Sequence, residues 1–207
     1  MRRLRLALVV AVLAALAPPL AGARIGAAPD ATPLGRVTGR AGRLLVAHPN
    51  MAGNFFAGTV IVLLRDGEGG AFGLVVNRPL GREAAEALFR QLDPELGERA
   101  RQAGLALYLG GPVDTALLFL LHATESGFAA GDPRKLLPLP GSDRRAMLVL
   151  GYAGWSAGQL DSEIARGDWL VVDADADLVF GGDDDGKWER AVSRTAPSPL
   201  PEAPLPE

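Results

Sequence analysis

The feature that most limits the fold of this chain is a pair of apolar runs, residues 59–64 and 71–76, separated by a glycine-rich segment. Both runs are continuous, and the first is rich in β-branched residues, a pattern typical of strands that are buried on both faces. The intervening residues 66–70 read Asp-Gly-Glu-Gly-Gly, which favours a hairpin connection. The chain is therefore predicted to fold around two buried strands that pair across a tight turn.

The second run ends abruptly at Asn77, Arg78 and Pro79. A buried strand thus delivers one amide and one guanidinium to a surface where the proline restricts the backbone. These groups can form a fork for a carboxylate, a phosphate or a loop of a partner. The alternative is structural, with Asn77 capping the end of the sheet and Arg78 pairing with an acidic neighbour.

A second candidate contact is the glycine pair Gly110 and Gly111, which follows an apolar run and precedes Pro112. Two glycines at a strand end can expose backbone N–H groups to an anion. The surrounding residues match neither the G-x-G-x-x-G pattern nor the Lys-Ser/Thr pair of a phosphate-binding loop. The alternative is a tight turn that lets two backbone segments pack closely.

The remaining apolar runs predict further short strands and helices. An apolar stripe with helical spacing predicts a helix after Pro79 that ends at Asp93. Residues 123–141 have no such period and are expected to be irregular, whereas a last helical turn is expected at 188–192. Further strands are predicted at 44–47, 105–109, 117–121, 146–150, 169–172 and 178–180.

Another helix is predicted to begin at Ser156, because Ser156 and Gln159 have the spacing of a capping box. Gly167 supplies the left-handed residue that ends such a helix. The acidic residues Asp161 and Glu163 fall away from the apolar positions of this helix. Both carboxylates are therefore expected to face water.

Residues 1–23 have the three parts of an export signal: arginines within the first five positions, an apolar run at 6–17, and an Ala-Gly-Ala cleavage pattern before Arg24. The apolar run is shorter than the roughly 20 residues that span a bilayer. The chain is therefore expected to be exported to the periplasm and to have no transmembrane helix after cleavage. A cytoplasmic location is the alternative, with residues 1–23 arising from a misassigned start or forming a short uncleaved anchor.

Charge and composition exclude several classes of site. Removing residues 1–23 takes away three arginines and leaves 18 basic and 24 acidic residues, a net charge of −6, which argues against nucleic acid as a partner. The absence of cysteine excludes disulfides, thiolate metal sites and a cysteine nucleophile. The aspartate runs 173–177 and 183–186 lack the glycine and glutamate positions of a calcium loop, so they are interpreted as solvated turns and no metal or cofactor is assigned.

The chain divides into four parts. Residues 1–23 are the predicted signal peptide, and residues 24–42 form a linker of small residues and proline that is expected to be flexible. The folded domain is expected at 43–192. Residues 193–207 are expected to form a disordered, proline-rich tail.

Four motifs in this chain resemble the YqgE/AlgH family of bacterial proteins: Leu44-Leu-Val-Ala-His-Pro, Gly73-Leu-Val-Val-Asn-Arg-Pro, Leu109-Gly-Gly-Pro-Val and Leu150-Gly-Tyr-Ala-Gly-Trp-Ser-Ala-Gly-Gln-Leu. The resemblance covers about residues 40–192. It implies an α+β fold with a mixed, partly barrel-like β-sheet flanked by a few helices, and no established enzymatic activity. One branch of the family is named as a transcriptional regulator of exopolysaccharide synthesis. The family has no agreed catalytic residues, so none are carried over.

Two features of the chain depart from this resemblance. Members of the family are usually cytoplasmic and lack an export signal, whereas residues 1–23 here have the pattern of one. The segment between His122 and Met147 also looks shorter than in relatives, as if a strand and a helix were trimmed. Both departures weigh against a transcriptional role.

A serine hydrolase that uses Ser156 is a minor alternative, because Gly154-Trp-Ser-Ala-Gly158 matches the letters of a nucleophile elbow. Such an enzyme also needs a histidine that follows the serine in the chain. Both histidines, His48 and His122, precede Ser156, so the order of a hydrolase triad fails. No catalytic residue is therefore assigned.

The sequence favours a non-enzymatic binding or regulatory module that is exported to the periplasm. Its expected contact surface comprises Asn77, Arg78, Gly110 and Gly111, and its partner is an unknown protein or small molecule. A cytoplasmic, transcription-linked regulator is the alternative function. The oligomeric state is left open.

Overall fold

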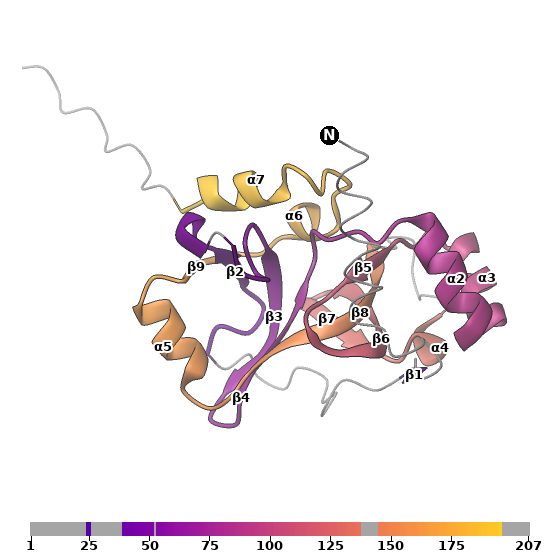
Figure 1. Ribbon diagram of the computed structural model, residues 1–207, viewed down its shortest axis with the longest axis horizontal. Coiled ribbons are helices and arrows are strands. Elements are labelled where there is room, and N and C mark those ends of the chain that lie inside the picture. The colour runs from indigo at the N-terminus through magenta and orange to yellow at the C-terminus, as the bar shows by residue number, and fades with distance from the viewer. Residues whose placement is uncertain (1–23, 26–38, 52, 138–144, 196–207) are drawn as a thin grey trace, which may run out of the picture.

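The computed structural model describes residues 24–25, 39–51, 53–137 and 145–195. These residues form an α+β domain in which a nine-stranded mixed sheet is flanked by helices (Figure 1). The expected fold class is confirmed. The strands are β1 (Arg24–Ile25), β2 (Leu44–Ala47), β3 (Val60–Gly67), β4 (Gly70–Val75), β5 (Leu107–Leu109), β6 (Val113–Thr124), β7 (Gly127–Gly131), β8 (Ala146–Trp155) and β9 (Trp169–Val172). The helices are η2 (Pro49–Met51), α2 (Arg82–Leu92), α3 (Pro94–Gln102), α4 (Pro133–Leu136), α5 (Gln159–Ala165), α6 (Ala176–Phe180) and α7 (Lys187–Ser193).

The predicted hairpin of buried strands lies at the centre of the sheet. β3 and β4 pair antiparallel, with β2 beside β3 and β8 beside β4. All residues of β4 are buried, because apolar clusters cover both faces of the strand. At the turn, Gly70 has a φ of 103°, and a Cβ there would lie 2.2 Å from the carbonyl oxygen of Trp155. Only glycine allows this close approach of the two backbones.

β8 connects the two halves of the sheet and is longer than the strand predicted at 146–150. Its first half pairs antiparallel with β6 and parallel with β5, and its last residues pair with β4. Gly151 lies between these segments with a φ of 73°, a conformation that favours glycine. The strand order is therefore β1-β6-β8-β4-β3-β2-β9, with β5 beside β8 and β7 beside β6.

Three apolar clusters pack against the sheet, and different helices cover them (Figure 1). α5 covers one cluster through Leu160. α2 and α3 cover a second cluster on the other half of the sheet through Phe89 and Leu96. α6 and α7 close the third cluster through Leu178 and Ala191, so the C-terminal helices belong to the core.

The prediction that residues 123–141 are irregular is wrong. β6 continues to Thr124, and β7 and α4 follow it, so the strand and helix that looked trimmed are present. β7 has the sequence Gly-Phe-Ala-Ala-Gly, which has little intrinsic preference for a strand. It is a strand because it pairs antiparallel with β6 over five residue pairs.

Two helices, α6 and α3, are present that the sequence did not predict. Residues 178–180, predicted as a strand, belong to α6, because the Asp175 carboxylate accepts a hydrogen bond from the Leu178 N–H at 2.7 Å and caps the helix. α3 begins directly after α2, because the Asp93 carboxylate accepts from the Leu96 N–H at 3.0 Å. Aspartate is as typical of a turn as of the first position of a helix, so the sequence alone does not distinguish a capped helix from a turn.

Parts of the expected linker at 24–42 are joined to the domain. β1 pairs in parallel with β6, and Arg40 Nε donates to Asp66 Oδ2 at 2.8 Å, so the packed domain starts before residue 43. The predicted signal peptide, most of the linker and the tail beyond residue 195 lie outside the described residues. Within the described part of the chain, no helix is both long and apolar enough to cross a membrane.

Candidate functional site

A cavity of about 440 Å³ lies between α5, the start of β9 and the segment that follows β2. This volume is within the range of small-molecule sites, about 300–1,000 Å³. The walls combine aromatic, amide and charged side chains. The lining residues are Asn50, Met51, Asn54, Phe56, Gly154, Trp155, Gln159, Glu163, Arg166, Gly167, Asp168 and Trp169.

Glu163 and Asp168 are the two half-buried carboxylates that line this cavity. Glu163 Oε2 accepts hydrogen bonds from Trp155 Nε1 and from Trp169 Nε1, each at 2.8 Å. Its Oε1 accepts from Gln159 Nε2 at 2.9 Å. All three donors are neutral, and no ion pair joins Glu163 to any of the residues that the structure describes. The carboxylate is therefore positioned rigidly while its charge is left without a described partner.

The local fold explains this arrangement. Trp155 ends β8 and Trp169 begins β9, and α5 is the connection between these two strands. The two indole rings are buried and lie edge to face, with centroids 5.9 Å apart. Phe56 adds a third ring, 5.4 Å from that of Trp169. Because the flanking strand ends meet beneath the helix, Glu163 can reach both indoles.

The expectation that Glu163 faces water is wrong, whereas Asp161 is exposed. Asp161 pairs with Arg40 at 2.5 Å on the outer side of α5. Gln159 and Glu163 are four residues apart, a spacing that places both side chains on one face of the helix. That spacing, together with a tryptophan at each flanking strand end, is the sequence signal that could have identified the site.

The other charges on the cavity wall neutralise each other. Arg166 Nη2 lies 2.6 Å from Asp168 Oδ2, and the Arg166 side chain is 61% exposed. Asn50 and Asn54 add exposed amides to the rim. The cavity therefore has a net charge of about −1, which resides on Glu163.

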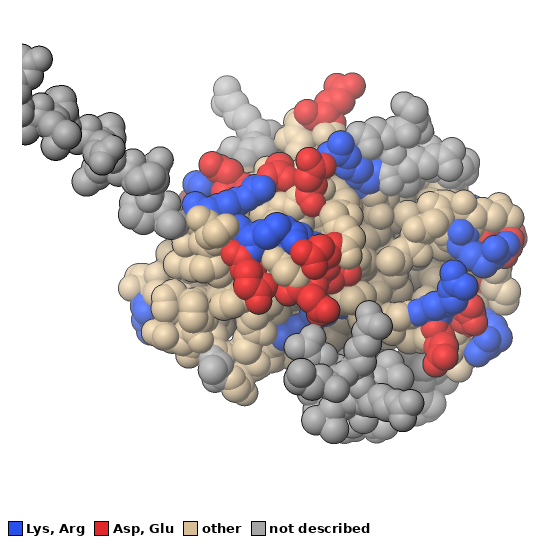
Figure 2. All heavy atoms as spheres, turned by 90° about the horizontal axis from the view of Figure 1, so that it is seen from above, with Lys and Arg blue, Asp and Glu red and all other residues tan. Residues whose placement is uncertain are grey.

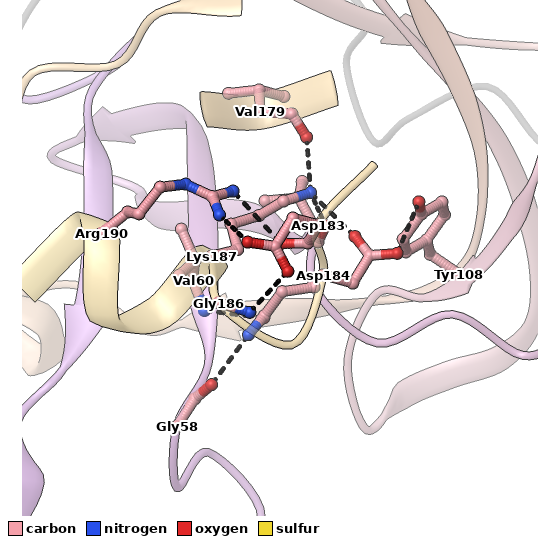
Figure 3. A network of polar contacts seen from close by, with 11 residues as sticks. Gly58, Val60, Tyr108, Val179, Asp183, Asp184, Gly186, Lys187 and Arg190 are labelled. Atoms are coloured by element: carbon pink, nitrogen blue, oxygen red, sulfur yellow. Dashed lines mark hydrogen bonds and ion pairs between the residues drawn. The ribbon is translucent and has the colours of Figure 1, made fainter. Parts of the chain in front are cut away.

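Asn77, a residue of the predicted contact surface, uses its amide to fix the end of β4. Its Oδ1 accepts from the Val60 N–H at 2.9 Å, and its Nδ2 donates to the Gly58 carbonyl at 2.8 Å (Figure 3). These are the contacts of the structural alternative, in which Asn77 caps the sheet end. The amide holds the segment that leads from the cavity into β3.

Arg78 acts on the same segment. Its Nη2 donates to the Ala57 carbonyl at 3.3 Å, and its guanidinium lies 4.7 Å from the centre of the Phe55 ring. Burial lowers the pKa of the Arg78 guanidinium. Because Phe56 lies between these two contacts, Asn77 and Arg78 together position the aromatic wall of the cavity.

Gly110 and Gly111 lie beside β4 and β8, close to the backbone of Arg78, whose carbonyl accepts from the Leu109 N–H at 2.9 Å. The Gly110 N–H donates to the Leu150 carbonyl at 2.8 Å and is therefore engaged. A Cβ on Gly111, which has a φ of 158°, would lie 2.1 Å from the Tyr152 backbone. The geometry of both glycines is that of close backbone packing.

Lys187 lies at the centre of a second polar cluster, which includes Asp184 and Tyr108 (Figure 3). Its side chain is 0% exposed, and Nζ donates to the Val76 carbonyl at 2.7 Å and the Val179 carbonyl at 2.9 Å. Asp184 Oδ1 lies 3.0 Å from Nζ, and Asp184 Oδ2 accepts from the Tyr108 hydroxyl at 3.1 Å. The sequence alone does not indicate this role for Lys187.

The pKa shifts in this cluster follow from burial. Burial lowers the pKa of Lys187, and the hydrogen bond and charge of Asp184 oppose that shift. Burial, followed by the charge of Asp184, raises the pKa of the Tyr108 hydroxyl. The cluster joins α6 and α7 to β4, and none of its members lines the cavity.

Ser156 does not cap α5, because Gly158 adopts a left-handed conformation with a φ of 72° and the helix begins at Gln159. The Ser156 N–H and hydroxyl both donate to Gln159 Oε1, at 3.1 and 3.0 Å. His122 pairs with Ala146 at the far end of β8, roughly 30 Å along the strand from Ser156 at about 3.3 Å per residue. His48 Nδ1 accepts from the Asn50 N–H at 3.2 Å. Neither histidine is placed to activate Ser156.

The aspartate runs lie on the face that carries α7, where acidic and basic side chains are interspersed (Figure 2). Four of these aspartates pair with four different arginines within the described residues. The pairs are Arg43–Asp173, Arg194–Asp175, Arg145–Asp177 and Arg190–Asp183. Among the residues that the structure describes, no group of three or more His, Asp or Glu side chains is arranged to hold a metal ion.

Comparison with known proteins gives consistent matches. The model of the family described as AlgH-like matches residues 44–199. A UPF0301 protein of Methylococcus capsulatus is 41% identical over 164 residues, which cover 73% of this chain and 88% of the relative. A UPF0301 protein of Ruegeria pomeroyi is 39% identical over 165 residues, which cover 73% of this chain and 89% of the relative.

Two solved structures share the fold. The solution structure of the AlgH protein from Pseudomonas aeruginosa matches with a TM-score of 0.58 and 32% identity, covering 75% of this chain and 88% of that chain. The crystal structure of a protein from Corynebacterium diphtheriae matches with a TM-score of 0.60 and 27% identity, covering 81% of this chain and 93% of that chain.

Proposed function

The chain belongs to the AlgH-like family of UPF0301 proteins, and from this premise we propose that it is an exported, non-enzymatic binding or regulatory module. Its ligand occupies the cavity between α5, β9 and the segment after β2. The observation that carries this proposal is the Glu163 carboxylate, which two indoles and an amide orient in a cavity of about 440 Å³. A convergent set of polar groups in a concave site is typical of ligand binding.

The geometry around Ser156 supports binding rather than hydrolysis. A nucleophilic serine needs a base within hydrogen-bonding distance, and the Ser156 hydroxyl donates instead to Gln159. The partner of that serine is an amide, which cannot accept its proton in a reaction near neutral pH. Serine at this position thus supports the orientation of Gln159, which in turn donates to Glu163.

Asn77 and Arg78, which the sequence favoured as a contact surface, support the cavity wall in this proposal. Asn77 and Arg78 hold Ala57, Gly58 and Val60, so they fix the segment that carries Phe56. Their polar groups are engaged within the domain, whereas the cavity offers a carboxylate without a described counter-charge. We therefore assign the binding site to the cavity that Phe56 lines, to which neither Asn77 nor Arg78 contributes a wall.

Photo-crosslinking tests the proposed site. A benzophenone amino acid replaces Asn54 at the cavity rim, and the matched control replaces the exposed Glu86 on α2. The full-length protein is expressed in its native host and irradiated. An adduct of defined mass from position 54, absent from position 86, is the expected result. Equal background at both positions, or an adduct only when the probe replaces Arg78, would contradict the proposed site.

Export is tested separately. The pattern in residues 1–23 supports cleavage before Arg24. N-terminal sequencing of protein from the periplasmic fraction is expected to begin at Arg24. An intact Met1 on protein from the soluble cytoplasmic fraction would reject export and favour the cytoplasmic regulator.

A further inference from the structure

We infer that the cavity binds an organic cation that carries N–H donors, either a primary ammonium or a guanidinium group. This inference rests on the proposed binding function and specifies its ligand class. Three observations lead to it: the charge of Glu163, the acceptor capacity that remains on its carboxylate, and the character of the surrounding wall.

The charge of Glu163 is not needed to satisfy the indoles. A buried indole N–H requires one acceptor, and a backbone carbonyl is sufficient. Trp188 in the same domain demonstrates this, because its Nε1 donates to the Ala47 carbonyl at 2.9 Å. Three hydrogen bonds from neutral donors stabilise the half-buried carboxylate but leave its negative charge uncompensated by any described cation. A bound cation supplies that compensation.

The carboxylate also retains room for a ligand. A carboxylate offers about four acceptor positions on its two oxygens. Trp155 and Trp169 take two on Oε2, and Gln159 takes one on Oε1. One position on Oε1 is left for a donor from the cavity, and a charged N–H donor there forms the stronger class of hydrogen bond.

The wall supports a cation over an anion. Arg166 is the cavity's basic residue among those described, and it is paired with Asp168. Asn54 Oδ1 accepts from the Phe56 N–H at 2.8 Å and retains one further acceptor position. The amide oxygen of Asn50 can also accept a hydrogen bond from an ammonium or guanidinium group. Phe56, Trp155 and Trp169 also line the cavity, and the face of an aromatic ring attracts cations.

Binding measurements with defined probes test this inference. Isothermal titration of the full chain uses n-butylammonium as the minimal ligand and three probes for the source of the cation: spermidine, Nα-acetyl-lysine amide and glucosamine. Tetramethylammonium, a cation without N–H donors, and acetate are the controls. At least one cation with N–H donors is expected to bind more tightly than both controls. The tightest binder among spermidine, Nα-acetyl-lysine amide and glucosamine identifies the chemical source of the cation. Equal binding of the controls, or no binding by any probe, would overturn the inference.

Two variants change the cavity charge in opposite directions. Glu163→Gln removes the charge and is expected to weaken n-butylammonium binding by about 10- to 100-fold, as expected for one charged hydrogen bond. Arg166→Gln removes the partner of the Asp168 carboxylate. This variant is expected to strengthen n-butylammonium binding by about two- to fivefold. Arg166 is exposed, so this variant keeps the test valid even if Glu163→Gln fails to fold. Weaker cation binding by Arg166→Gln would overturn the inference.

The two proposals fail in distinguishable ways. A crosslinked adduct at position 54 without binding of any cation rejects the ligand class and keeps the binding site. Cation binding that is unaffected by Glu163→Gln rejects this cavity as the cation site.

Discussion

Lys187 is a fully buried cation whose neighbours are two backbone carbonyls and the Asp184 carboxylate. Replacing it by methionine would leave Asp184 as a partly buried charge without its counter-ion. We expect Lys187→Met to lower the free energy of unfolding by about 3–5 kcal/mol, the range for breaking a buried ion pair from one side. Urea denaturation measures this loss.

The matched control for Lys187 is Arg190→Met, which removes a basic residue of the same helix from a partly exposed ion pair with Asp183. We expect this variant to lose less than about 1 kcal/mol, because ion pairs near the surface contribute little. Equal losses for both variants would contradict the structural role assigned to Lys187.

Tyr108 predicts a specific dependence of stability on alkaline pH. Burial and the Asp184 charge raise the pKa of Tyr108 in the folded state above the ordinary value of 10.0. Above that pH the unfolded state releases the phenol proton while the folded state retains it, so the free energy of unfolding falls as pH rises. Thermal denaturation between pH 9 and 11 is expected to show this fall. Tyr108→Phe is expected to reduce its slope, and an unchanged slope would contradict the assignment.

At the scale of structural elements, the connection between β4 and the segment before β3 depends on one amide. Asn77→Ala removes two hydrogen bonds and leaves the buried Val60 N–H without its acceptor. We expect a loss of about 1–3 kcal/mol in the free energy of unfolding, together with weaker ligand binding because Phe56 is less well positioned. The amide control is Gln91→Ala on the exposed face of α2, which is expected to change neither quantity.

The turn between β5 and β6 depends on close backbone packing. A methyl group at Gly111 would lie 2.1 Å from the Tyr152 carbonyl, so Gly111→Ala is expected to destabilise the domain by several kcal/mol, about 4 or more, or to prevent folding. The control is Gly69→Ala, where an added Cβ has no heavy atom within 4 Å. Near-wild-type thermal stability of Gly111→Ala would favour an exposed glycine loop that could contact an anion.

Much of the element pattern is encoded locally and could be predicted. Continuous apolar runs identified β2, β3, β4 and β9, because the apolar pattern of a buried strand is visible in its own residues. β7 was missed, because its strand geometry is imposed by pairing with β6. α6 and α3 were missed, because an aspartate cap resembles a turn in sequence.

The candidate site was less predictable than the fold. The spacing of Gln159 and Glu163 and the tryptophans at the flanking strand ends are visible in the sequence. Only the placement of β8 and β9 in the sheet shows that Trp155 and Trp169 meet beneath α5 and donate to Glu163. Asn77 and Arg78 were correctly placed at a strand end. The sequence does not show whether their side chains bond to groups within the domain or face an external partner. Their partners prove to be backbone groups of the neighbouring segment.

At the scale of the whole molecule, one domain combines two polar clusters that share no residue. The Lys187 cluster joins the C-terminal helices to the sheet, and the Glu163 cluster forms the wall of a cavity. Only the second is open to a ligand. The proposed binding function therefore requires that Trp155, Trp169 and Glu163 form part of a ligand site.

The indole N–H resonances in a ¹H–¹⁵N spectrum test this claim most directly, because the chain has only three tryptophans. The full-length protein is titrated with n-butylammonium chloride against sodium chloride at equal ionic strength. We expect the Trp155 and Trp169 signals to shift and saturate together while the Trp188 signal stays in place. Unchanged Trp155 and Trp169 signals, or an equal shift of Trp188, would contradict it.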